Sequence, residues 1–284
     1  MDIINDVRQM RDISAGWALK SLAPVLVPTM GFLHEGHRAL LRAGREMCGD
    51  GRPLVLSIFV NPTQFGPAED LETYPRDLER DIEVARAEGV DIVFNPSAEG
   101  MYPGGFQTFV EVTELSAPLC GQSRPGHFSG VATVVLKLFN IVQPAMAVFG
   151  RKDYQQLLVI RRMAEDLNLG VEITGVETVR ESDGLAMSSR NAYLSPDERK
   201  AALCVPLSLD AAEGALRSGE AQGSVIIEKM KKVIEKEPLA VIEYVDIRDS
   251  GTLAPIKRVE GQVVAAVAIR IGRTRLIDNR VLKP

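Results

Sequence analysis

The sequence predicts an α/β fold, in which a Rossmann-like, doubly wound parallel sheet is followed by a smaller α+β C-terminal domain with a short antiparallel sheet. Through the first two-thirds of the chain, apolar runs alternate with amphipathic helical patterns, which is typical of a parallel sheet covered on both faces. This alternation stops near residue 194, where helices and then strands with short turns follow. Polar loops also follow several of the strands, where such sheets bind ligands.

The elements of the first domain are predicted from these apolar runs and the helical patterns between them. Strands are expected at residues 25–27, 54–60, 90–94, 145–149 and 171–176. Helices are expected at residues 38–46, 77–88, 131–142 and 154–167. Each strand is short and apolar throughout, as expected for strands that are buried on both faces.

The second domain begins with a helix signal at Ser195-Pro196, an N-cap followed by a proline in the first turn. Helices are predicted at residues 196–218 and 224–235, and strands at 241–247, 263–269 and 273–282. We therefore expect two domains, at residues 1–180 and 181–284, with one large α/β domain as the alternative.

Composition limits the partners of the protein. The formal net charge of −5 gives no general attraction to nucleic acids or anionic membranes. The three cysteines are far apart and form neither a disulfide framework nor a CxxC metal pattern. No apolar stretch approaches the ~20 residues that span a bilayer, and the N-terminus lacks the pattern of a signal peptide. We expect a cytoplasmic protein with small-molecule partners and with neither nucleic acid nor membrane as a partner.

The segment at residues 28–37 carries two histidines and two glycines between a predicted strand and a predicted helix. The first N–H groups of a helix lack intrahelical partners and attract anions. His34 and His37 are three residues apart and face the same way in the first turn. An imidazole there is biased towards its neutral form, and it can donate one N–H to a phosphate oxygen. The alternative is that these histidines only cap or pack the helix start.

A zinc site is the second alternative for the histidine pair. The sequence His-Glu-Gly-His has a spacing of three, whereas the metalloprotease pattern His-Glu-x-x-His has a spacing of four. His127 is the only other histidine that could be a third ligand. The spacing therefore argues against zinc.

Two later segments could bind a polyphosphate. Ser188, Ser189 and Arg190 place two hydroxyls beside a guanidinium, which pairs well with phosphate. Lys152 could neutralise a triphosphate, and Asp153 could orient a base or ribose. The alternatives are a solvated loop for the first segment and a helix cap for Asp153.

The histidine segment and the later Met-Ser-Ser-Arg segment together resemble the paired signatures of the HxGH nucleotidyltransferase superfamily, which includes class I aminoacyl-tRNA synthetases. Longer strings narrow the resemblance to the pantothenate synthetase family, and they run from about residue 20 to the C-terminus. These strings are Pro28-Thr29-Met30-Gly31, Phe59-Val60-Asn61-Pro62-Thr63-Gln64-Phe65, Tyr74-Pro75-Arg76, Arg124-Pro125-Gly126-His127-Phe128-x-Gly130-Val131, Lys152-Asp153-Tyr154-Gln155-Gln156 and Ser188-Ser189-Arg190-Asn191.

The resemblance implies an activity. The family condenses pantoate with β-alanine, using ATP with Mg²⁺, and releases AMP and pyrophosphate through a pantoyl adenylate. It implies an ATP- and pantoate-binding domain at residues 1–180, a C-terminal lid domain at 181–284, and a homodimer. Adenylation suits the residues, because stabilising the α-phosphate and the departing pyrophosphate is mostly electrostatic work.

The resemblance also implies roles for individual residues. The nucleotide site would contain Met30, Gly31, Phe32, Leu33, His34, Glu35, Gly36, His37, Gly150, Arg151, Lys152, Asp153, Val179, Met187, Ser188, Ser189 and Arg190. The catalytic members of this set would be His34, His37, Lys152, Ser188, Ser189 and Arg190, with His37 as the proton donor. Gln64 and Gln156 would hold pantoate, with Asn61 and Arg124 as further contributors. Asp81 would be the carboxylate near Mg²⁺, an ion that usually keeps few protein ligands.

Three positions of the sequence depart from the family pattern. Phe32 stands where alanine is frequent, Thr63 where methionine is frequent, and Arg151 where glutamate is frequent. Arg151 would add positive charge beside the phosphate site.

One alternative function is that of an HxGH nucleotidyltransferase with another acceptor, and the other is that of a non-catalytic nucleotide- or tRNA-binding protein. The acidic net charge and the lack of a basic stripe argue against RNA.

Overall fold

The computed structural model of the chain describes residues 1–49, 51–67 and 69–284. The chain divides into two compact units. The first contains Met1–Ser116, Arg124–Arg151 and Gln155–Glu177, and the second contains Ala117–Ser123, Lys152–Tyr154 and Thr178–Pro284. Two short segments that precede residue 178 therefore belong to the second unit. The expected domain division at residue 180 stays a prediction.

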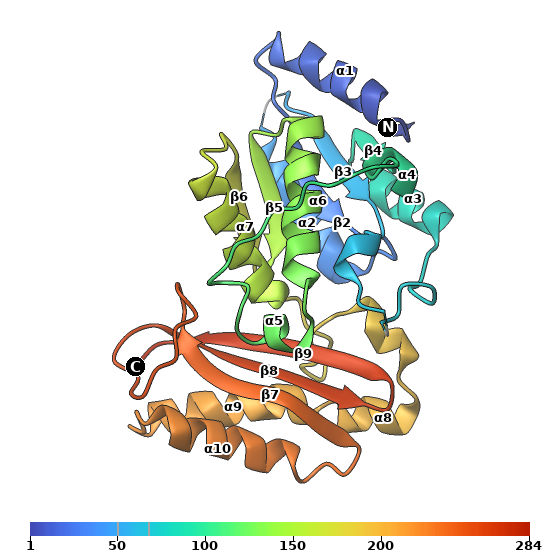
Figure 1. The fold of residues 1–284 in the computed structure, drawn as a ribbon. Coiled ribbons are helices and arrows are strands. Elements are labelled where there is room, and N and C mark those ends of the chain that lie inside the picture. The colour runs from blue at the N-terminus through green and yellow to red at the C-terminus, as the bar shows by residue number, and fades with distance from the viewer. Residues whose placement is uncertain (50, 68) are drawn as a thin grey trace. The chain divides into compact units, whose positions relative to one another are not determined.

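A six-stranded sheet forms the centre of the first unit (Figure 1). Its order is β1-β4-β3-β2-β5-β6, and all neighbouring strands are parallel. The strands are β1 (Asp2–Ile4), β2 (Val25–Thr29), β3 (Leu54–Ile58), β4 (Ile92–Phe94), β5 (Met146–Gly150) and β6 (Glu172–Val176). The chain moves outward from β2 through β3 to β4, then returns to the other side of β2 as β5. In such sheets ligands bind where the strand order reverses, here at the carboxyl ends of β2 and β5.

Helices cover both faces of this sheet. They are α1 (Val7–Ala18), α2 (Glu35–Met47), α3 (Leu78–Ala87), α4 (Ala98–Met101), α6 (His127–Val142) and α7 (Tyr154–Asp166). On one face, Val25 and Val27 of β2 pack in a cluster with Leu41 of α2 and Ala85 of α3. Side chains alternate along a strand, so Leu26 points to the opposite face, where it is also fully buried. The apolar strands are therefore covered on both sides, as the sequence predicts.

The second unit has a three-stranded antiparallel sheet in the order β7-β8-β9 (Figure 1). Its strands are β7 (Ala240–Asp249), β8 (Val263–Ile271) and β9 (Thr274–Leu282). Its helices are the short α5 (Cys120–Ser123), α8 (Pro196–Ala201), α9 (Cys204–Arg217) and α10 (Gly223–Ile234). Leu209 of α9, Ile226 of α10 and Val267 of β8 belong to one buried cluster, so both long helices pack on this sheet.

The predicted fold class is confirmed, and two details of the prediction were wrong. The helix predicted at residues 196–218 is two helices, α8 and α9, separated at Ala202 and Leu203. Pro206 explains the break, because proline has no N–H to donate and its ring clashes with the carbonyl four residues earlier. The prediction also missed β1 and α1, which precede the first apolar run.

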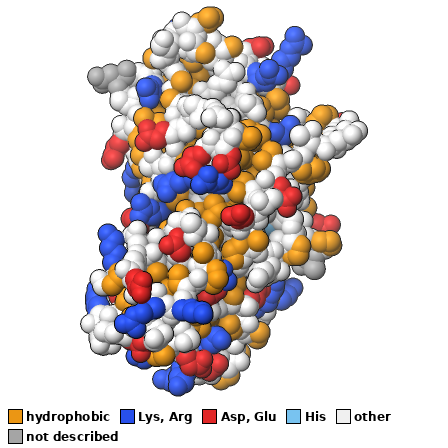
Figure 2. All heavy atoms as spheres, turned by 60° about the vertical axis from the view of Figure 1, so that its left-hand side comes forward, with side chains coloured by type: hydrophobic (Ala, Val, Ile, Leu, Met, Phe, Trp, Pro, Cys, Tyr) orange, Lys and Arg blue, Asp and Glu red, His pale blue; other side chains and the backbone are white. Residues whose placement is uncertain are grey.

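The surface carries charges of both signs. On the face shown in Figure 2, Lys and Arg side chains lie interspersed with Asp and Glu side chains. Within the part of the chain that the structure describes, no helix is long and apolar enough to cross a membrane.

Candidate functional site

The two histidines lie at the carboxyl end of β2, where α2 begins. His34 is the N-cap of α2, and its Nδ1 accepts a hydrogen bond from the Gly36 N–H at 3.1 Å. His37 Nδ1 accepts from the His34 N–H at 3.3 Å. The ring centroids are 4.0 Å apart. Because both Nδ1 atoms are acceptors, each neutral ring carries its proton on Nε2, a nitrogen that can donate to an anion.

Asp81 of α3 fixes the loop before these histidines. It is 1% exposed, and its two carboxylate oxygens accept hydrogen bonds from the N–H groups of Phe32 and Leu33, both at 2.7 Å. Burial raises the pKa of Asp81, although the two backbone donors favour its charged form. The sequence predicted that the Asp81 carboxylate lies near Mg²⁺. The structure places it against the backbone of residues 30–37, the segment called the histidine loop from here on.

Other members of the predicted nucleotide set have identifiable surroundings. Leu33 is 1% exposed and packs in the core, so its side chain does not face a ligand site. The Glu35 carboxylate pairs with Arg42 of the same helix. Phe32 has a φ of 53°, and the Arg80 guanidinium lies 5.3 Å from its ring centroid. Thus the aromatic residue that departs from the family pattern stacks with an arginine.

Gln64 connects the histidine loop with the loop after β3. It ends a short 3₁₀ helix, η1 (Pro62–Gln64), and its Nε2 donates to the Met30 Sδ at 3.1 Å. Asn61 is 1% exposed, and its Nδ2 donates to Gln64 Oε1 at 3.2 Å and to the Gly130 carbonyl of α6 at 3.1 Å. Asn61 thus holds Gln64 in place, and its predicted contact with substrate stays a prediction.

Arg124, another predicted substrate residue, is the centre of an ion-pair network. Its Nε and Nη2 donate to the two oxygens of Glu69 at 2.6 and 2.7 Å. Its Nη2 also donates to the Gln64 carbonyl at 3.2 Å, and His127 Nδ1 contacts the same carbonyl at 2.8 Å. Burial disfavours the charged form of Glu69, but the hydrogen bonds and charge of Arg124, together with the Gly66 N–H, outweigh it and lower the pKa of Glu69 to about 2. Sequence reasoning missed Glu69, because only its spatial neighbours give it a role.

The loop after β5 carries the next group of predicted residues. Gly150 ends β5, and Arg151 pairs with the exposed carboxylate of Glu177. The positive charge predicted for Arg151 is thereby partly balanced. Gln156 is half-buried in the first turn of α7.

Lys152 and Asp153 follow in η2 (Arg151–Asp153) and belong to the second unit. The Lys152 side chain is 20% exposed, and its Nζ lies 4.0 Å from Asp153 Oδ1. The Lys152 carbonyl accepts from Asn279 of β9 at 2.8 Å. The backbone of Lys152 is thus fixed to the antiparallel sheet of its own unit.

The second unit also carries the Met-Ser-Ser-Arg segment. The Met187 N–H donates to the Val179 carbonyl at 3.0 Å, which closes a hairpin-like loop. Ser188 is the N-cap of η3 (Ser189–Tyr193), and its hydroxyl accepts from the Arg190 N–H at 3.3 Å. Ser189 is 8% exposed. The structure thus brings Val179 together with the segment from Met187 to Arg190, as one compact loop.

Residues that sequence reasoning missed anchor this loop. Arg180 makes a two-pronged ion pair with Asp278 of β9, at 2.6 and 3.1 Å. Glu181 accepts from Asn191 Nδ2 at 2.7 Å and from Arg199 Nη2 at 2.8 Å. The string Arg180-Glu181-Ser182-Asp183-Gly184 is visible in the sequence, but its partners lie up to 98 residues away.

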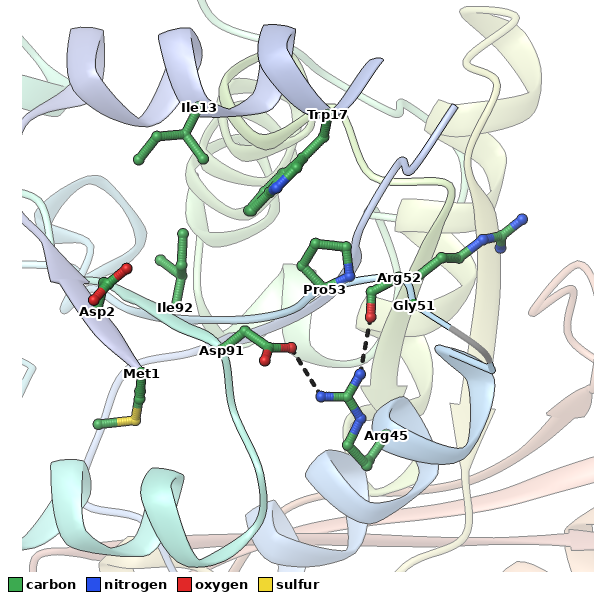
Figure 3. Close-up of a pocket in the computed structure, with 10 residues that line it drawn as sticks. All are labelled: Met1, Asp2, Ile13, Trp17, Arg45, Gly51, Arg52, Pro53, Asp91 and Ile92. Carbon is green, nitrogen blue, oxygen red and sulfur yellow. Dashed lines mark hydrogen bonds and ion pairs between the residues drawn. The ribbon is translucent and has the colours of Figure 1, made fainter. Parts of the chain in front are cut away.

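A pocket of about 540 Å³ lies elsewhere in the first unit (Figure 3). Trp17 and Ile13 of α1 line it, together with Pro53 and the Arg45–Asp91 ion pair. Pro53 and Asp91 directly precede β3 and β4, so the pocket lies at the amino ends of these strands. The histidine loop follows the carboxyl end of β2, at the opposite edge of the sheet.

The fold and the histidine loop together define the class of protein. A doubly wound α/β sheet with an HxGH segment capping a helix at its switch point is the arrangement of a nucleotide-binding enzyme. Residues 2–281 match the family model described as pantoate-beta-alanine ligase. The chain belongs to the pantoate–β-alanine ligase family.

Individual relatives agree with this assignment over their full lengths. The chain is 53% identical to the pantothenate synthetase of Geobacter sulfurreducens over 282 residues, which covers 99% of both chains. It is 55% identical to that of Syntrophotalea carbinolica over 284 residues, with the same coverage. The chain is therefore a ligase that condenses pantoate with β-alanine in a reaction driven by ATP.

Solved structures give the same result. The pantothenate synthetase of Thermus thermophilus matches with a TM-score of 0.93 and 44% identity, and the match covers 100% of both chains. The pantoate-beta-alanine ligase of Francisella tularensis, complexed with beta-gamma ATP and beta-alanine, matches with a TM-score of 0.81 and 32% identity. That match covers 99% of this chain and 97% of the other. The fold class predicted from the sequence is thereby confirmed a second time.

Proposed function

We propose that the reaction proceeds through a pantoyl adenylate, formed at the histidine loop after β2. A pantoate carboxylate oxygen attacks the α-phosphorus of ATP, the bond from that phosphorus to the bridging oxygen breaks, and pyrophosphate leaves. The β-alanine amine then attacks the acyl carbon, the bond from that carbon to the AMP oxygen breaks, and the amine loses its proton. A carboxylate is a poor acyl donor until its oxygen becomes part of a good leaving group, which AMP provides.

The paired histidines carry this proposal. His34 and His37 accept backbone hydrogen bonds at Nδ1, so their Nε2–H groups are the donors offered to phosphate oxygens. Charge grows on those oxygens as pyrophosphate departs, and a pre-oriented donor stabilises the transition state more than the bound substrate. His37, the proton donor of the family pattern, is proposed to donate a hydrogen bond from Nε2–H to the departing group and to keep its proton. Met30, Gly31, Phe32, Leu33, Glu35 and Gly36 are proposed to line the nucleotide site through the same loop.

Lys152, Ser188, Ser189 and Arg190 are proposed as the remaining phosphate ligands. The grounds are the charges and hydroxyls of their side chains and the hydrogen bonds that order their backbone. Lys152 is a compact cation, whereas Arg190 can form a two-pronged pair with phosphate. Ser188 and Ser189 add hydroxyl donors at the start of η3. Gly150, Arg151, Asp153, Val179 and Met187 are proposed to complete the nucleotide site. Hydrogen bonds at the Lys152 carbonyl and at the Ser188 hydroxyl support these roles, because they order the two residues and limit the entropy lost on binding.

Gln64 and Gln156 are proposed to hold pantoate, with Gln64 also near β-alanine. Pantoate carries hydroxyls and a carboxylate, and each glutamine amide offers both donors and an acceptor. The Gln64–Met30 contact supports this role, because it sets a residue proposed to bind pantoate directly beside the loop proposed to bind ATP. Asn61 and Arg124 are proposed to act on pantoate through Gln64, whose side chain and carbonyl they respectively hold.

Mg²⁺ is proposed to enter with ATP as the magnesium complex of the nucleotide. Among the described residues, no group of three or more His, Cys, Asp or Glu could hold a metal ion. We propose that triphosphate oxygens and water hold the ion, which is usual for Mg²⁺. When bound, it would neutralise charge on the triphosphate. A homodimer and a cytoplasmic location also stay predictions from the sequence and its family.

A product assay tests the proposed function. The purified protein is incubated with ATP, Mg²⁺, pantoate and β-alanine, and each organic substrate is omitted in turn. AMP and pyrophosphate are expected in equal amounts, with steady turnover only when both organic substrates are present. Release of AMP that does not depend on pantoate would reject the assignment. Transfer to a nucleotide monophosphate in place of pantoate would instead favour the other nucleotidyltransferase function.

A further inference from the structure

The turn between β2 and α2 has an unusual backbone. Gly31 has a φ of 83° and Phe32 a φ of 53°, so two consecutive residues occupy the left-handed region. Phe32 is strained there, because a Cβ atom crowds the carbonyl in that conformation. Successive N–H groups in such a turn point towards one side and form a concave site for an anion. The anion in this structure is the carboxylate of Asp81, which accepts from Phe32 and Leu33.

The fit of Asp81 into this turn is close on every side. A methyl group on Gly31 would lie 2.9 Å from Asp81 Oδ2 and 3.0 Å from the Ile58 side chain. The Gly31 N–H is held separately, by the Thr29 hydroxyl at 3.2 Å, and that hydroxyl donates to the Ser57 carbonyl at 2.8 Å. Three successive N–H groups of the turn therefore have fixed acceptors, directly before the His34 N-cap.

This geometry does not suit a metal ligand. Mg²⁺ binds oxygens at about 2.0–2.1 Å in an octahedron that includes several waters, so it needs open space around the carboxylate. Asp81 is 1% exposed, and each of its oxygens already accepts a short hydrogen bond from a backbone N–H. The residue that the family resemblance assigns to the metal is thus enclosed by the turn.

We propose that Asp81 is a positioning residue for the reaction rather than a ligand of Mg²⁺. Its carboxylate holds the Phe32 and Leu33 N–H groups, stabilises the strained turn, and so fixes the two imidazoles at the start of α2. The inference rests on the proposed role of His37 in adenylation. It extends that role to a side chain that meets neither ATP nor pantoate.

The principal test is Asp81→Asn, which keeps the size of the side chain but replaces one acceptor oxygen with an NH₂ group. The pre-steady-state rate of adenylation is expected to fall about 10- to 100-fold, the range for losing one hydrogen bond to a charged group. The Mg²⁺ concentration for half-maximal activity should stay within about twofold of wild type. A rate restored by excess Mg²⁺, or a rate equal to wild type, would overturn the proposal.

A double-substitution cycle separates positioning from a general loss of structure. If Asp81 acts through the histidines, adding Asp81→Asn to a His37→Ala protein should slow adenylation by less than about threefold further. Multiplication of the two effects would contradict the proposal. Asp77→Asn is the matched control, because the Asp77 carboxylate also accepts a backbone hydrogen bond, from Arg80 at the start of α3, where Asp77 is the helix N-cap. Its adenylation rate should equal that of wild type.

Two further measurements keep the test decisive. If Asp81→Asn does not give folded protein by circular dichroism, Thr29→Val replaces it, because it removes the acceptor of the Gly31 N–H from the same turn. Thr29→Val should lower the adenylation rate without moving the Mg²⁺ midpoint, and a wild-type rate would count against the proposal. If wild-type protein releases no pantoate-dependent AMP, the proposed function itself is rejected. If wild-type protein is active and the Asp81→Asn variant is equally active, only the positioning role of Asp81 is rejected.

Discussion

Replacing Gly130 by alanine is expected to impair the use of pantoate while leaving ATP binding nearly unchanged. Gly130 lies in α6 where that helix meets η1. A methyl group there would lie 2.4 Å from the Thr63 carbonyl oxygen and 2.7 Å from the Gln64 nitrogen. These are backbone atoms, so no side-chain rotation can relieve the overlap.

The size of the effect follows from the displacement. Atoms in ordinary contact are about 3.5 Å apart, so η1 and Gln64 must move by roughly 1 Å. A shift of that size at a group that positions substrate costs about 100-fold in rate. Overpacking of this kind also lowers the free energy of unfolding by about 1–3 kcal/mol.

Steady-state kinetics and urea unfolding measure both effects. For Gly130→Ala, kcat/KM for pantoate should fall about 10- to 100-fold, while the Kd for ATP should change less than about threefold. Gly214→Ala is the matched control, because Gly214 lies in α9 and, among the described residues, no atom beyond its own stretch of helix lies within 4 Å of its would-be Cβ. It should leave the kinetics unchanged and stabilise the protein by about 0.5–1 kcal/mol. A Gly130→Ala protein with wild-type kcat/KM for pantoate would refute the reasoning.

Four further predictions follow from the site and its surroundings. His37→Ala should slow single-turnover adenylation by about 100-fold or more, and a near-normal rate would refute its role. Gln64→Ala should lose pantoate binding, measured by calorimetry, with ATP binding kept, whereas equal loss of both would make Gln64 structural. Because the pKa of Glu69 is lowered to about 2, its pair with Arg124 should stabilise the protein above pH ~4.5 and lose this effect as the pH falls towards 2. Urea unfolding at several pH values should show this loss of stability in wild type, and Glu69→Gln should lack this contribution to the pH dependence. Burial raises the pKa of Cys204 to about 12, so native protein should leave this thiol unalkylated at pH ~7, and rapid labelling would contradict its burial.

The sequence predicted the sheet well, because the relevant signals are local. The apolar runs at β2 and β3 and the helical periodicity of α2 depend on residues close together in the chain. It missed β1, since three residues at a sheet edge give too little pattern. The break between α8 and α9 was missed although Pro206 is a local signal for it.

The candidate site could be proposed from the sequence because its motifs are contiguous strings, and the roles of its residues stay predictions. The structure sets Gln64 against Met30, and it sets the rings of His34 and His37 side by side. The supporting contacts were beyond the reach of the sequence. Asp81 lies 49 residues from Phe32, and Arg124 lies 55 residues from Glu69. Only the folded structure shows that Asp81 accepts hydrogen bonds from the backbone of the histidine loop and that Arg124 donates to the Gln64 carbonyl and to Glu69.

The most direct measurement of the central claim is exchange of labelled pyrophosphate into ATP. If the histidine loop supports adenylation of a carboxylate, exchange should require pantoate and Mg²⁺, proceed without β-alanine, and fall about 100-fold or more in His37→Ala. Exchange that proceeds without pantoate, or only after β-alanine is added, would contradict the pantoyl-adenylate mechanism.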